Sequence, residues 1–369
     1  MENLVIMFEN VYKGKKVIIT GNTGFKGSWL TLWLNKLGAD LYGYSNGIIT
    51  SPSMYEELGL SKIIKTEFSD INDIKSLEQF INKVKPDFIF HLAAQSLVFE
   101  SFLNPTETIK TNLIGTMNLL EVLRSYNGEC STVLITSDKV YENIEQIWGY
   151  KETDQIGGKD IYSASKGASE IIINSYLKTF FLNKLNIKIA VGRAGNVIGG
   201  GDWSKNRIVV DCYRAWSEDK KVQIRNPNAT RPWQHVLEPL SGYLLLGKEL
   251  YFNLHNHSKF NFGPEQNQIK SVKSLINDLF EQIDSSTLQE CYSYSPSNLK
   301  EANLLSLNCE KAFYELRWKP TLNYEQLISF TSQWYNGYYF SNNSLLDLSF
   351  QQITQFENFA KKNKAIWTT

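Results

Sequence analysis

The chain has little cysteine and histidine, and it carries no excess of charge of either sign. Its four cysteines share no CxxC or Cys-His spacing, which argues against a zinc site or a disulfide framework and suits a reducing compartment. We therefore expect no bound metal. The 38 lysines and arginines balance the 38 aspartates and glutamates, so no overall field steers the protein toward nucleic acid. Any anionic ligand must be held by local groups.

Long apolar runs are also missing. The first residues contain only a short apolar stretch interrupted by Glu2, Asn3 and Glu9, and no uncharged run reaches the length of a membrane span. We therefore expect a cytoplasmic protein that does not associate with a membrane. The 369 residues exceed what one compact core usually supports, so we expect a large domain and a smaller one.

Short β-branched runs alternate with helical patterns between about residue 16 and residue 195. The runs lie at 16–20, 40–44, 63–68, 87–92, 132–137 and 187–193, and the helical patterns lie near 26–37, 73–84, 106–126 and 162–182. Buried strands separated by helices predict right-handed crossovers and a doubly wound parallel sheet. The fold class is therefore α/β, of the Rossmann type.

We predict that this Rossmann domain covers residues 1–195. The segment 234–250 is strongly apolar and helical, and we expect the range 232–258 that contains it to pack back on the first domain. The ranges 196–231 and 259–369 are richer in loops, Trp, Tyr and Asn. They are predicted to form a smaller α+β substrate-binding domain and a C-terminal tail.

A glycine-rich turn, Gly21, Gly24 and Gly27, follows the first predicted strand directly. Glycines allow a tight turn there and let backbone amides at a helix N-terminus approach a pyrophosphate. Such a pattern alone could be a structural turn, but its place at the first crossover favours dinucleotide binding. The end of the second strand has no Asp or Glu for a ribose, and no Arg or Lys lies between residues 43 and 61 for a 2'-phosphate. We favour NAD as the cofactor.

Further candidates for cofactor contact lie in this turn or near the ends of later strands. Asp70 could accept from the adenine amino group, although it could equally be a turn or capping residue. Asn112 could bridge an apolar helix to the active-site strand. The remaining candidates are Thr23, Phe25, Lys26, Ile71, Leu92, Ala93, Ala94 and Gln95.

Tyr162 and Lys166 are the strongest catalytic candidates. A spacing of four places both side chains on one face of a helix. The ammonium is then expected to lower the pKa of the phenol, so that Tyr162 can accept a proton while hydride leaves an alcohol. An isolated Tyr-x-x-x-Lys pattern is often only a solvated pair, but the upstream glycines and strands favour catalysis.

Ser137, Asp138 and Lys139 follow the fifth predicted strand. A hydroxyl, a carboxyl group and an amine at the carboxyl end of a strand suit acid-base chemistry. The alternative is a turn capped by Asp138. Farther along, Asp202 and Trp203 follow a run of three glycines, and Arg225 and Arg231 flank a loop, a composition that suits a nucleotide diphosphate.

Several segments together resemble the extended short-chain dehydrogenase/reductase family and, within it, the CDP-glucose 4,6-dehydratase group. They are GNTGFKGSWLTLWL, HLAAQ, TSDKVYEN, RAGNVIGGGDW and RPWQHVLEP, in order between residue 17 and about residue 250. The resemblance implies a lyase that converts CDP-glucose to CDP-4-keto-6-deoxyglucose for deoxysugar and surface polysaccharide biosynthesis. NAD removes hydride at C4, water leaves across C5 and C6, and hydride returns to C6.

The resemblance also implies roles for individual residues. Tyr162 and Lys166 become the catalytic pair, Ser137 assists at the sugar 4-hydroxyl, and Asp138 protonates the departing C6 hydroxyl. Related dehydratases place a glutamate after that aspartate as the base for the C5 proton, whereas this sequence has Lys139. We hypothesise that Lys139 is the base; the alternative is that it stays charged and stabilises the enolate. The implied substrate contacts are Asn196, Asp202, Trp203, Arg207 and Arg231.

Members of this family commonly pair the two long helices that follow the fourth and fifth strands. Here these are 106–126 and 162–182, so a homodimer is expected, possibly extended to a tetramer. Two other functions stay open: a nucleotide-sugar 4-epimerase or a dehydratase of another nucleotide sugar, and a non-catalytic dinucleotide-binding module. An epimerase needs no elimination acid, so Asp138 favours a dehydratase over an epimerase.

Overall fold

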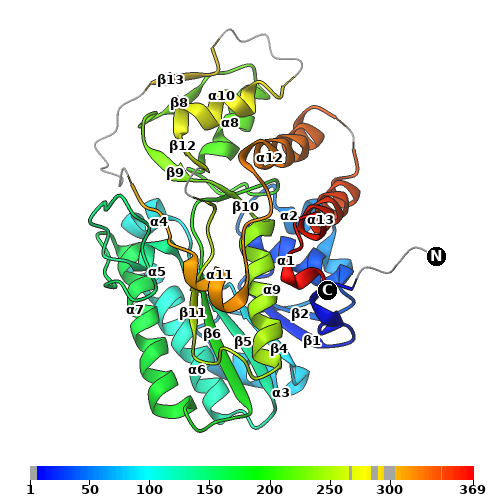
Figure 1. The fold of residues 1–369 in the computed structure, drawn as a ribbon, viewed down its shortest axis with the longest axis vertical. Helices are drawn as coiled ribbons and strands as arrows, with labels where there is room; N and C mark the ends of the chain where they lie inside the picture. Colours follow the sequence, from blue (N-terminus) through cyan, green and yellow to red (C-terminus); the bar gives the residue numbers. More distant parts are fainter. Residues whose placement is uncertain (1–5, 266–267, 284–289, 295–303, 342) are drawn as a thin grey trace, which may run out of the picture.

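A computed structural model describes residues 6–265, 268–283, 290–294, 304–341 and 343–369. Its centre is a seven-stranded, all-parallel sheet with the order β11-β6-β5-β4-β1-β2-β3 (Figure 1). The strands are β1 (Lys16–Thr20), β2 (Asp40–Ser45), β3 (Lys65–Phe68), β4 (Phe88–His91), β5 (Cys130–Ile135), β6 (Ile187–Arg193) and β11 (Lys259–Asn261). The strand order reverses between β1 and β4, and open α/β sheets bind ligands at the carboxyl ends beside such a switch.

Helices cover both faces of the sheet, and successive residues of one strand pack against helices on opposite faces. Val17 and Ile19 belong to the core that contains α1 (Phe25–Lys36) and α9 (Leu237–Tyr251), whereas Ile18 faces the opposite core. Successive residues of a strand point to opposite faces, so a strand buried on both faces is apolar throughout. The second core contains α3 (Ile74–Val84), α6 (Gly115–Ser125) and α7 (Ile161–Tyr176).

The other elements are shorter or peripheral. In the first half they are η1 (Phe8–Asn10), α2 (Met54–Glu57), η2 (Leu60–Lys62), α4 (Val98–Leu103), α5 (Pro105–Ile109), η3 (Lys110–Ile114), η4 (Asp138–Val140) and η5 (Leu177–Phe181). In the second half they are β7 (Val197–Ile198), α8 (Ile208–Trp216), β8 (Val222–Ile224), β9 (Thr230–Pro232), β10 (Gln234–His235), β12 (Ile269–Ser271), α10 (Val272–Phe280), β13 (Tyr292–Tyr294), α11 (Glu310–Leu316), α12 (Tyr324–Tyr339), α13 (Leu345–Lys362) and η7 (Ile366–Thr368).

The smaller part of the molecule lies beyond the carboxyl ends of the sheet, where Figure 1 shows α8 and α10 at the top. Three two-stranded pairs, β7 with β10, β9 with β12 and β8 with β13, connect these helices to the rest. Aromatic rings fill its interior: Tyr213 stacks on Tyr335 at 4.7 Å, and Trp216 contacts Phe280 at 5.2 Å between ring centroids.

The fold class predicted from the sequence is confirmed, and all six predicted strands are present. The seventh strand, β11, lies in the range 259–369 that the sequence assigned to the substrate-binding part. It was missed because only three residues, Lys259–Asn261, form it. The predicted helix at 106–126 is interrupted by a π-helical turn, η3, between α5 and α6.

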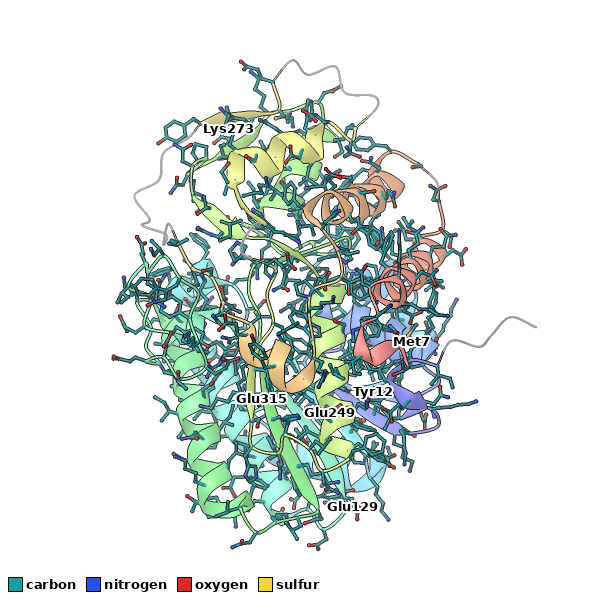
Figure 2. The ribbon with its side chains drawn as sticks, in the orientation of Figure 1. Met7, Tyr12, Glu129, Glu249, Lys273 and Glu315 are labelled. Atoms are coloured by element: carbon teal, nitrogen blue, oxygen red, sulfur yellow. The ribbon has the colours of Figure 1, made fainter. Side chains whose placement is uncertain are left out.

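The two ends of the described chain pack on the Rossmann sheet and its helices. Tyr12, labelled beside α9 in Figure 2, donates its hydroxyl hydrogen to the carbonyl of Leu244 at 2.5 Å. From the C-terminal side, α13 packs against α1, where Glu357 accepts a hydrogen bond from Trp33 Nε1 at 2.9 Å. The C-terminal tail thus contacts the first helix of the sheet domain. α9 packs against β5 and β6.

Candidate active site

The glycine-rich turn joins β1 to α1 in a conformation that needs glycine. Gly21 has a φ of +72°, and a Cβ there would lie 2.8 Å from the backbone nitrogen of Ala93. A Cβ at Gly27 would lie 2.2 Å from the carbonyl oxygen of Gly21. Helix α1 begins at Phe25 with Gly24 as its N-cap. Free amides at this helix end and a backbone without side chains form a cradle that fits a pyrophosphate.

Polar side chains of the turn are bound to the neighbouring strand β2 and its loop. The Thr23 hydroxyl lies 2.7 Å from Ser45 Oγ and 2.7 Å from the carbonyl oxygen of Gly47. Asn22, which the sequence reasoning missed, is buried and donates to Thr66 Oγ1 at 2.8 Å. Its Oδ1 atom has no hydrogen-bond partner among the described residues, so a polar acceptor is left over inside the cradle.

The loop after β4 lies against the glycine turn. The amide of Ala93 donates to the hydroxyl of Thr20 at 3.1 Å, and the small residues Ala93 and Ala94 follow Leu92 at the end of the strand. His91 is fully bonded: Nδ1 lies 2.8 Å from Thr20 Oγ1 and Nε2 lies 3.1 Å from Thr116 Oγ1. Burial lowers the pKa of His91 to about 3. It is a packing histidine.

Asn112, in the π-helical turn η3, links this loop to the helix of the catalytic pair. Its Oδ1 accepts from the amide of Gln95 at 2.8 Å, and its Nδ2 donates to Gln95 O at 3.0 Å and to Ser165 Oγ at 2.8 Å. Ser165 lies on α7 between Tyr162 and Lys166. π-helical turns occur often at functional sites. Asn112 thus bridges the loop after β4 to α7, whereas the sequence led us to expect a bridge to the active-site strand.

Asp70 and Ile71 behave differently from one another. Asp70 is exposed, and its Oδ1 accepts from the backbone and side-chain nitrogens of Asn72 at 2.9 and 3.0 Å. This is the turn geometry that the sequence left as the alternative. Ile71 is buried, and its side chain packs so close to Gly115 that a Cβ there would lie 2.5 Å away.

The catalytic pair lies in the first turns of α7. Asp160 caps this helix by accepting from the amide of Ser163 at 2.9 Å. The side chains of Tyr162 and Lys166 are both buried, and the amide of Tyr162 donates to Ser101 Oγ at 3.2 Å. Ser101 on α4 thus helps to fix the start of the helix, a contact that no sequence signal revealed.

Burial is the largest cause of the shift in the pKa of both members of the pair. Burial raises the pKa of Tyr162; the Ser137 hydroxyl and then the charge of Arg207 oppose that rise, and Lys166 is not among the causes. Burial, and then repulsion from Lys26, lower the pKa of Lys166 to about 8. Ser137 and Arg207 are therefore the groups that oppose the rise in the phenol pKa, and the lowering expected from Lys166 stays a prediction.

Lys26, at the start of α1, is electrostatically coupled to the other charged groups of the site. Burial lowers its pKa to about 8, Asp138 and Asp202 oppose the fall, and Arg207 adds to it. Because Coulomb interactions fade with distance, this coupling indicates that Lys26 is near Asp138, Asp202 and Arg207.

Ser137 and Asp138 form a hydrogen-bonded pair after β5. Ser137 Oγ donates to Asp138 Oδ1 at 2.9 Å and accepts from the amide of Lys139 at 3.2 Å. Asn196 Nδ2 donates to Asp138 Oδ2 at 3.4 Å. Asp138 is 3% exposed, and a Cβ at Gly195 would lie 2.0 Å from its carboxyl carbon. The glycine thus makes room for a buried acid beside Tyr162.

Arg207 and Asp202 border the site on the side of the smaller part. Arg207 Nη2 donates to the carbonyl of Ser96 at 3.2 Å, and its Nε lies 3.9 Å from Asp202 Oδ2. The Arg207 side chain is 46% exposed, so it is accessible to an anionic ligand. The structure therefore brings the loop after β4 and the loop before α8 together.

Trp203 requires a correction. The sequence suggested that its ring helps to shape the sugar or cytidine pocket, but the side chain is 2% exposed. Its ring packs against Tyr338 at 4.8 Å and Trp334 at 5.4 Å, and its Nε1 donates to Tyr339 OH at 3.3 Å. The ring is buried among aromatic side chains and its polar atom is bonded within the protein, so Trp203 is a packing residue.

Arg231 lies on β9, which pairs with β12, and its Nη1 donates to the carbonyl of Thr230 at 2.9 Å. In the part of the chain that is described, no group of three or more His, Cys, Asp or Glu side chains could hold a metal ion. None of the described helices is long and apolar enough to cross a membrane.

Comparison with known proteins identifies the family. The sequence profile described as GDP-mannose 4,6 dehydratase matches residues 18–331. The chain belongs to the GDP-mannose 4,6 dehydratase family. One curated relative is the CDP-glucose 4,6-dehydratase of Salmonella typhimurium. It is 40% identical to this chain over 338 residues, which cover 89% of this chain and 93% of the relative.

Solved structures agree with this family at the level of the fold. The dTDP-glucose 4,6-dehydratase of Bacillus anthracis in complex with NAD superposes with a TM-score of 0.74 at 21% identity, over 88% of this chain and 97% of that one. The UDP-glucose 4-epimerase of Thermotoga maritima with UDP-glucose gives 0.76 at 21% identity, over 88% and 99%. Dehydratases and epimerases of nucleotide sugars thus share the architecture of this chain.

Proposed function

We propose that this member of the family is an NAD-dependent CDP-glucose 4,6-dehydratase. The identity of 40% over most of the chain to a CDP-glucose 4,6-dehydratase supports the substrate. The observation that carries the reaction type is the buried carboxyl of Asp138, hydrogen bonded to Ser137 and electrostatically coupled to Tyr162. An epimerase needs no acid at this position, whereas elimination of a hydroxyl group does.

The residues near the glycine turn fit the cofactor. The amides at the start of α1 and the side-chain-free cradle of Gly21 and Gly27 would hold the pyrophosphate, and Lys26 and Lys166 would add positive charge. Bound NAD would accept the hydride from C4 of the sugar and return it at C6. Asp70 is proposed to contact the adenine while it keeps its turn with Asn72.

Each remaining step is assigned to a side chain of the site. Tyr162 takes the proton of the sugar 4-hydroxyl, and Ser137 donates a hydrogen bond to the same oxygen. Lys139 takes the C5 proton, which the new ketone makes acidic, and returns it to C5 when hydride adds at C6. Asp138 protonates the departing C6 hydroxyl. Arg207, with Asn196 and Arg231, is proposed to hold the substrate diphosphate, since guanidinium groups bind phosphate with two parallel hydrogen bonds.

We also propose a homodimer built on α5–α6 and α7. These segments expose apolar side chains that a partner would cover: Ile109 is 39% exposed, Ile171 is 55% exposed and Phe180 in η5 is 44% exposed. Replacing Ile171 by Glu should convert a dimer into a monomer in size-exclusion chromatography with light scattering; a monomeric wild type would contradict the proposal.

The four cysteines are free thiols, which fits the reducing cytoplasm.

A product assay tests the function directly. The purified protein and NAD are incubated in four separate reactions, one each with CDP-glucose, dTDP-glucose, GDP-mannose and UDP-glucose. Each product is then examined by mass spectrometry for the loss of one water. We expect water loss from CDP-glucose alone. Tyr162→Phe should lose turnover by a factor of about 10² to 10⁴, whereas Tyr176→Phe at the far end of the same helix should not. Turnover confined to another nucleotide sugar would refute the substrate, and an isomer of equal mass would indicate epimerisation.

A further inference from the structure

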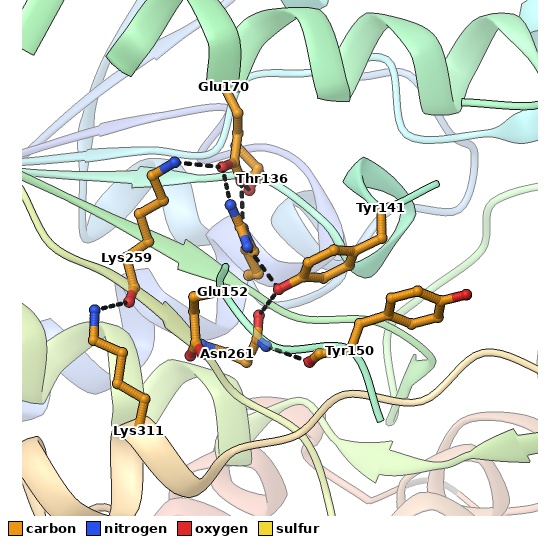
Figure 3. Close-up of polar contacts among 9 residues, drawn as sticks. Thr136, Tyr141, Tyr150, Glu152, Glu170, Lys259, Asn261 and Lys311 are labelled. Carbon is orange, nitrogen blue, oxygen red and sulfur yellow. Dashed lines mark hydrogen bonds and ion pairs between the residues drawn. The ribbon is translucent and has the colours of Figure 1, made fainter. Parts of the chain in front are cut away.

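A buried ion pair joins α7, the helix of Tyr162 and Lys166, to the end of β6; Figure 3 shows the polar contacts around its carboxylate, that of Glu170. Glu170 on α7 and Arg193 at the end of β6 both have side chains with 0% exposure. Arg193 Nε donates to Glu170 Oε1 at 2.7 Å, and Nη2 donates to Oε2, so the contact uses both carboxylate oxygens. Such bidentate pairs fix the relative orientation of two side chains as well as their charge.

The carboxylate of Glu170 joins the two halves of the site. Thr136 donates its hydroxyl hydrogen to Glu170 Oε1 at 2.6 Å, and Thr136 directly precedes Ser137 and Asp138. On α7, Glu170 follows Lys166 by four residues, as Lys166 follows Tyr162, so these side chains share one face of the helix. One buried group therefore sets the position of the end of β5 against the face of the helix that carries the catalytic pair.

Arg193 is held firmly on its other side. Its Nη1 donates to the hydroxyl oxygen of Tyr141 at 2.6 Å, and the guanidinium carbon lies 4.8 Å from the centroid of that ring. Tyr141 OH in turn donates to Asn261 Oδ1 at 2.8 Å, and Asn261 Nδ2 donates to Tyr150 O at 2.8 Å (Figure 3). The chain of bonds extends from α7 to β11, so the guanidinium has little freedom to turn away from Glu170.

The ion pair also affects the protonation of Lys166. Burial and the charge of Lys26 both lower the pKa of Lys166, and Glu170 is the group that opposes them. The charged or titratable groups coupled to Lys166 are Lys26 on α1, His91 on β4 and Glu170 on its own helix. Glu170 in turn has Lys259 on β11 beside it, with Nζ 3.9 Å from Oε2. Glu170 is thus the anion that favours the protonated form of Lys166.

Stability alone gives no reason to bury this pair. Removing two charges from water is costly, and apolar residues of similar volume often replace a buried ion pair without loss of stability. An arrangement that combines such a pair with hydrogen bonds to both halves of a reaction site instead indicates that its position and charge are used.

We propose that Glu170, held by Arg193, is a positioning residue: it fixes the distance between Tyr162–Lys166 and Ser137–Asp138 and keeps the Lys166 ammonium charged. Glu170 does not itself contact the substrate. The inference rests on the proposed function for its kinetic consequence, but its effect on Lys166 exists in the protein without any turnover.

The test replaces the ion pair by two neutral amides, Glu170→Gln with Arg193→Gln, so that neither buried charge is left alone. Competitive acetylation with trace acetic anhydride, followed by peptide mass spectrometry, measures the pH at which Lys166 loses its proton. We expect that pH to fall by about one unit in the double variant, because Glu170 is the member of the ion pair that raises the pKa of Lys166. The pH at which kcat changes with the protonation of Lys166 should move with it, while the KM for CDP-glucose stays within about threefold.

Two further variants separate charge from position. Thr136→Val removes one hydrogen bond to the same carboxylate but no charge, so Lys166 should titrate as in the wild type. Glu170→Asp keeps the charge but shortens its reach, so kcat should fall about tenfold without a change in that titration. It tests the positioning role by itself if the double variant does not fold. An unchanged Lys166 titration in the double variant, or wild-type kcat in Glu170→Asp, would overturn the proposal. A wild type that turns over no nucleotide sugar would refute the proposed function instead.

Discussion

Ser137 donates its hydroxyl hydrogen to the carboxylate of Asp138, with 2.9 Å between Oγ and Oδ1. The same hydroxyl lowers the pKa of Tyr162, whose burial acts in the opposite direction. One hydroxyl therefore lies between the proposed base of the oxidation step and the proposed acid of the elimination step. The two steps are served by adjacent groups, so a sugar with an intermediate ketone need not move between them.

Asp138→Asn should separate oxidation from elimination. The amide keeps the shape of the carboxyl group but cannot protonate the departing C6 hydroxyl, while Tyr162 and Lys166 are left intact. We expect overall turnover to fall by a factor of about 10² or more, and NADH to accumulate after substrate is added because the hydride has no acceptor at C6. Stopped-flow absorbance of NADH measures this directly.

Asp347→Asn is the matched control for this variant, because it makes the same change to an exposed carboxyl group on α13, outside the site. It should leave turnover unchanged and should not accumulate NADH. Wild-type turnover in Asp138→Asn would exclude Asp138 as the acid.

Lys139→Met tests the proposed base of the C5 proton. If Lys139 removes this proton, the variant should still oxidise C4, but exchange of the C5 hydrogen with deuterated solvent should fall by about 10² or more. Mass spectrometry of recovered substrate and product measures the exchange. C5 exchange at the wild-type rate would show that another group is the base, and Lys139 would then be left with a role in stabilising the enolate.

Much of this architecture could be predicted because it follows from local patterns. Short β-branched runs gave six strands, and the spacing of glycines after the first of them predicted the cradle at Gly21 and Gly27. The spacing of four between Tyr162 and Lys166 likewise needs only the geometry of a helix. Such features depend on residues that are close in the chain.

The rest depends on contacts between distant segments. The burial of Trp203 arises from α12, more than a hundred residues away, and nothing in its own surroundings distinguishes a packing ring from one that faces a ligand. Strand β11 is too short to produce a pattern. The pairing of Glu170 with Arg193 requires α7 and β6 to be placed side by side, although Glu170 at the fourth position after Lys166 could have suggested a buried anion.

Lys166→Met should stabilise the protein while it removes activity. The pKa of Lys166 is about 8 in the folded chain, below its ordinary value of 10.5, so the unfolded chain binds this proton more tightly. The buried charge therefore lowers the free energy of unfolding, and this effect is at its full size below pH 8. The wild type regains this free energy as the pH rises from about 8 to 10.5. We expect the variant to gain on the order of 1 to 3 kcal/mol at pH 7 and to lose that part of the pH dependence.

Urea unfolding at a series of pH values measures this difference. Lys220→Met is the control, because this lysine is 69% exposed and forms only a surface pair with Glu218. Its free energy of unfolding should stay within about 0.5 kcal/mol of the wild type. A Lys166→Met protein that is less stable than the wild type at pH 7 would show that the buried ammonium is compensated by its surroundings.

Gly27→Ala should disrupt the glycine-rich turn that forms the cofactor cradle. The added methyl group would lie 2.2 Å from the carbonyl oxygen of Gly21 and 2.8 Å from the Cα of Asn22, both of which are backbone atoms that cannot rotate away. We expect a loss of about 1 to 3 kcal/mol in the free energy of unfolding, together with a loss of NAD binding because the turn must open. Gly263→Ala, whose nearest neighbour would be the Cys309 sulfur at 3.4 Å, should leave both unchanged. Isothermal titration with NAD and urea unfolding measure the two effects, and normal NAD affinity in Gly27→Ala would show that the dinucleotide does not bind in this turn.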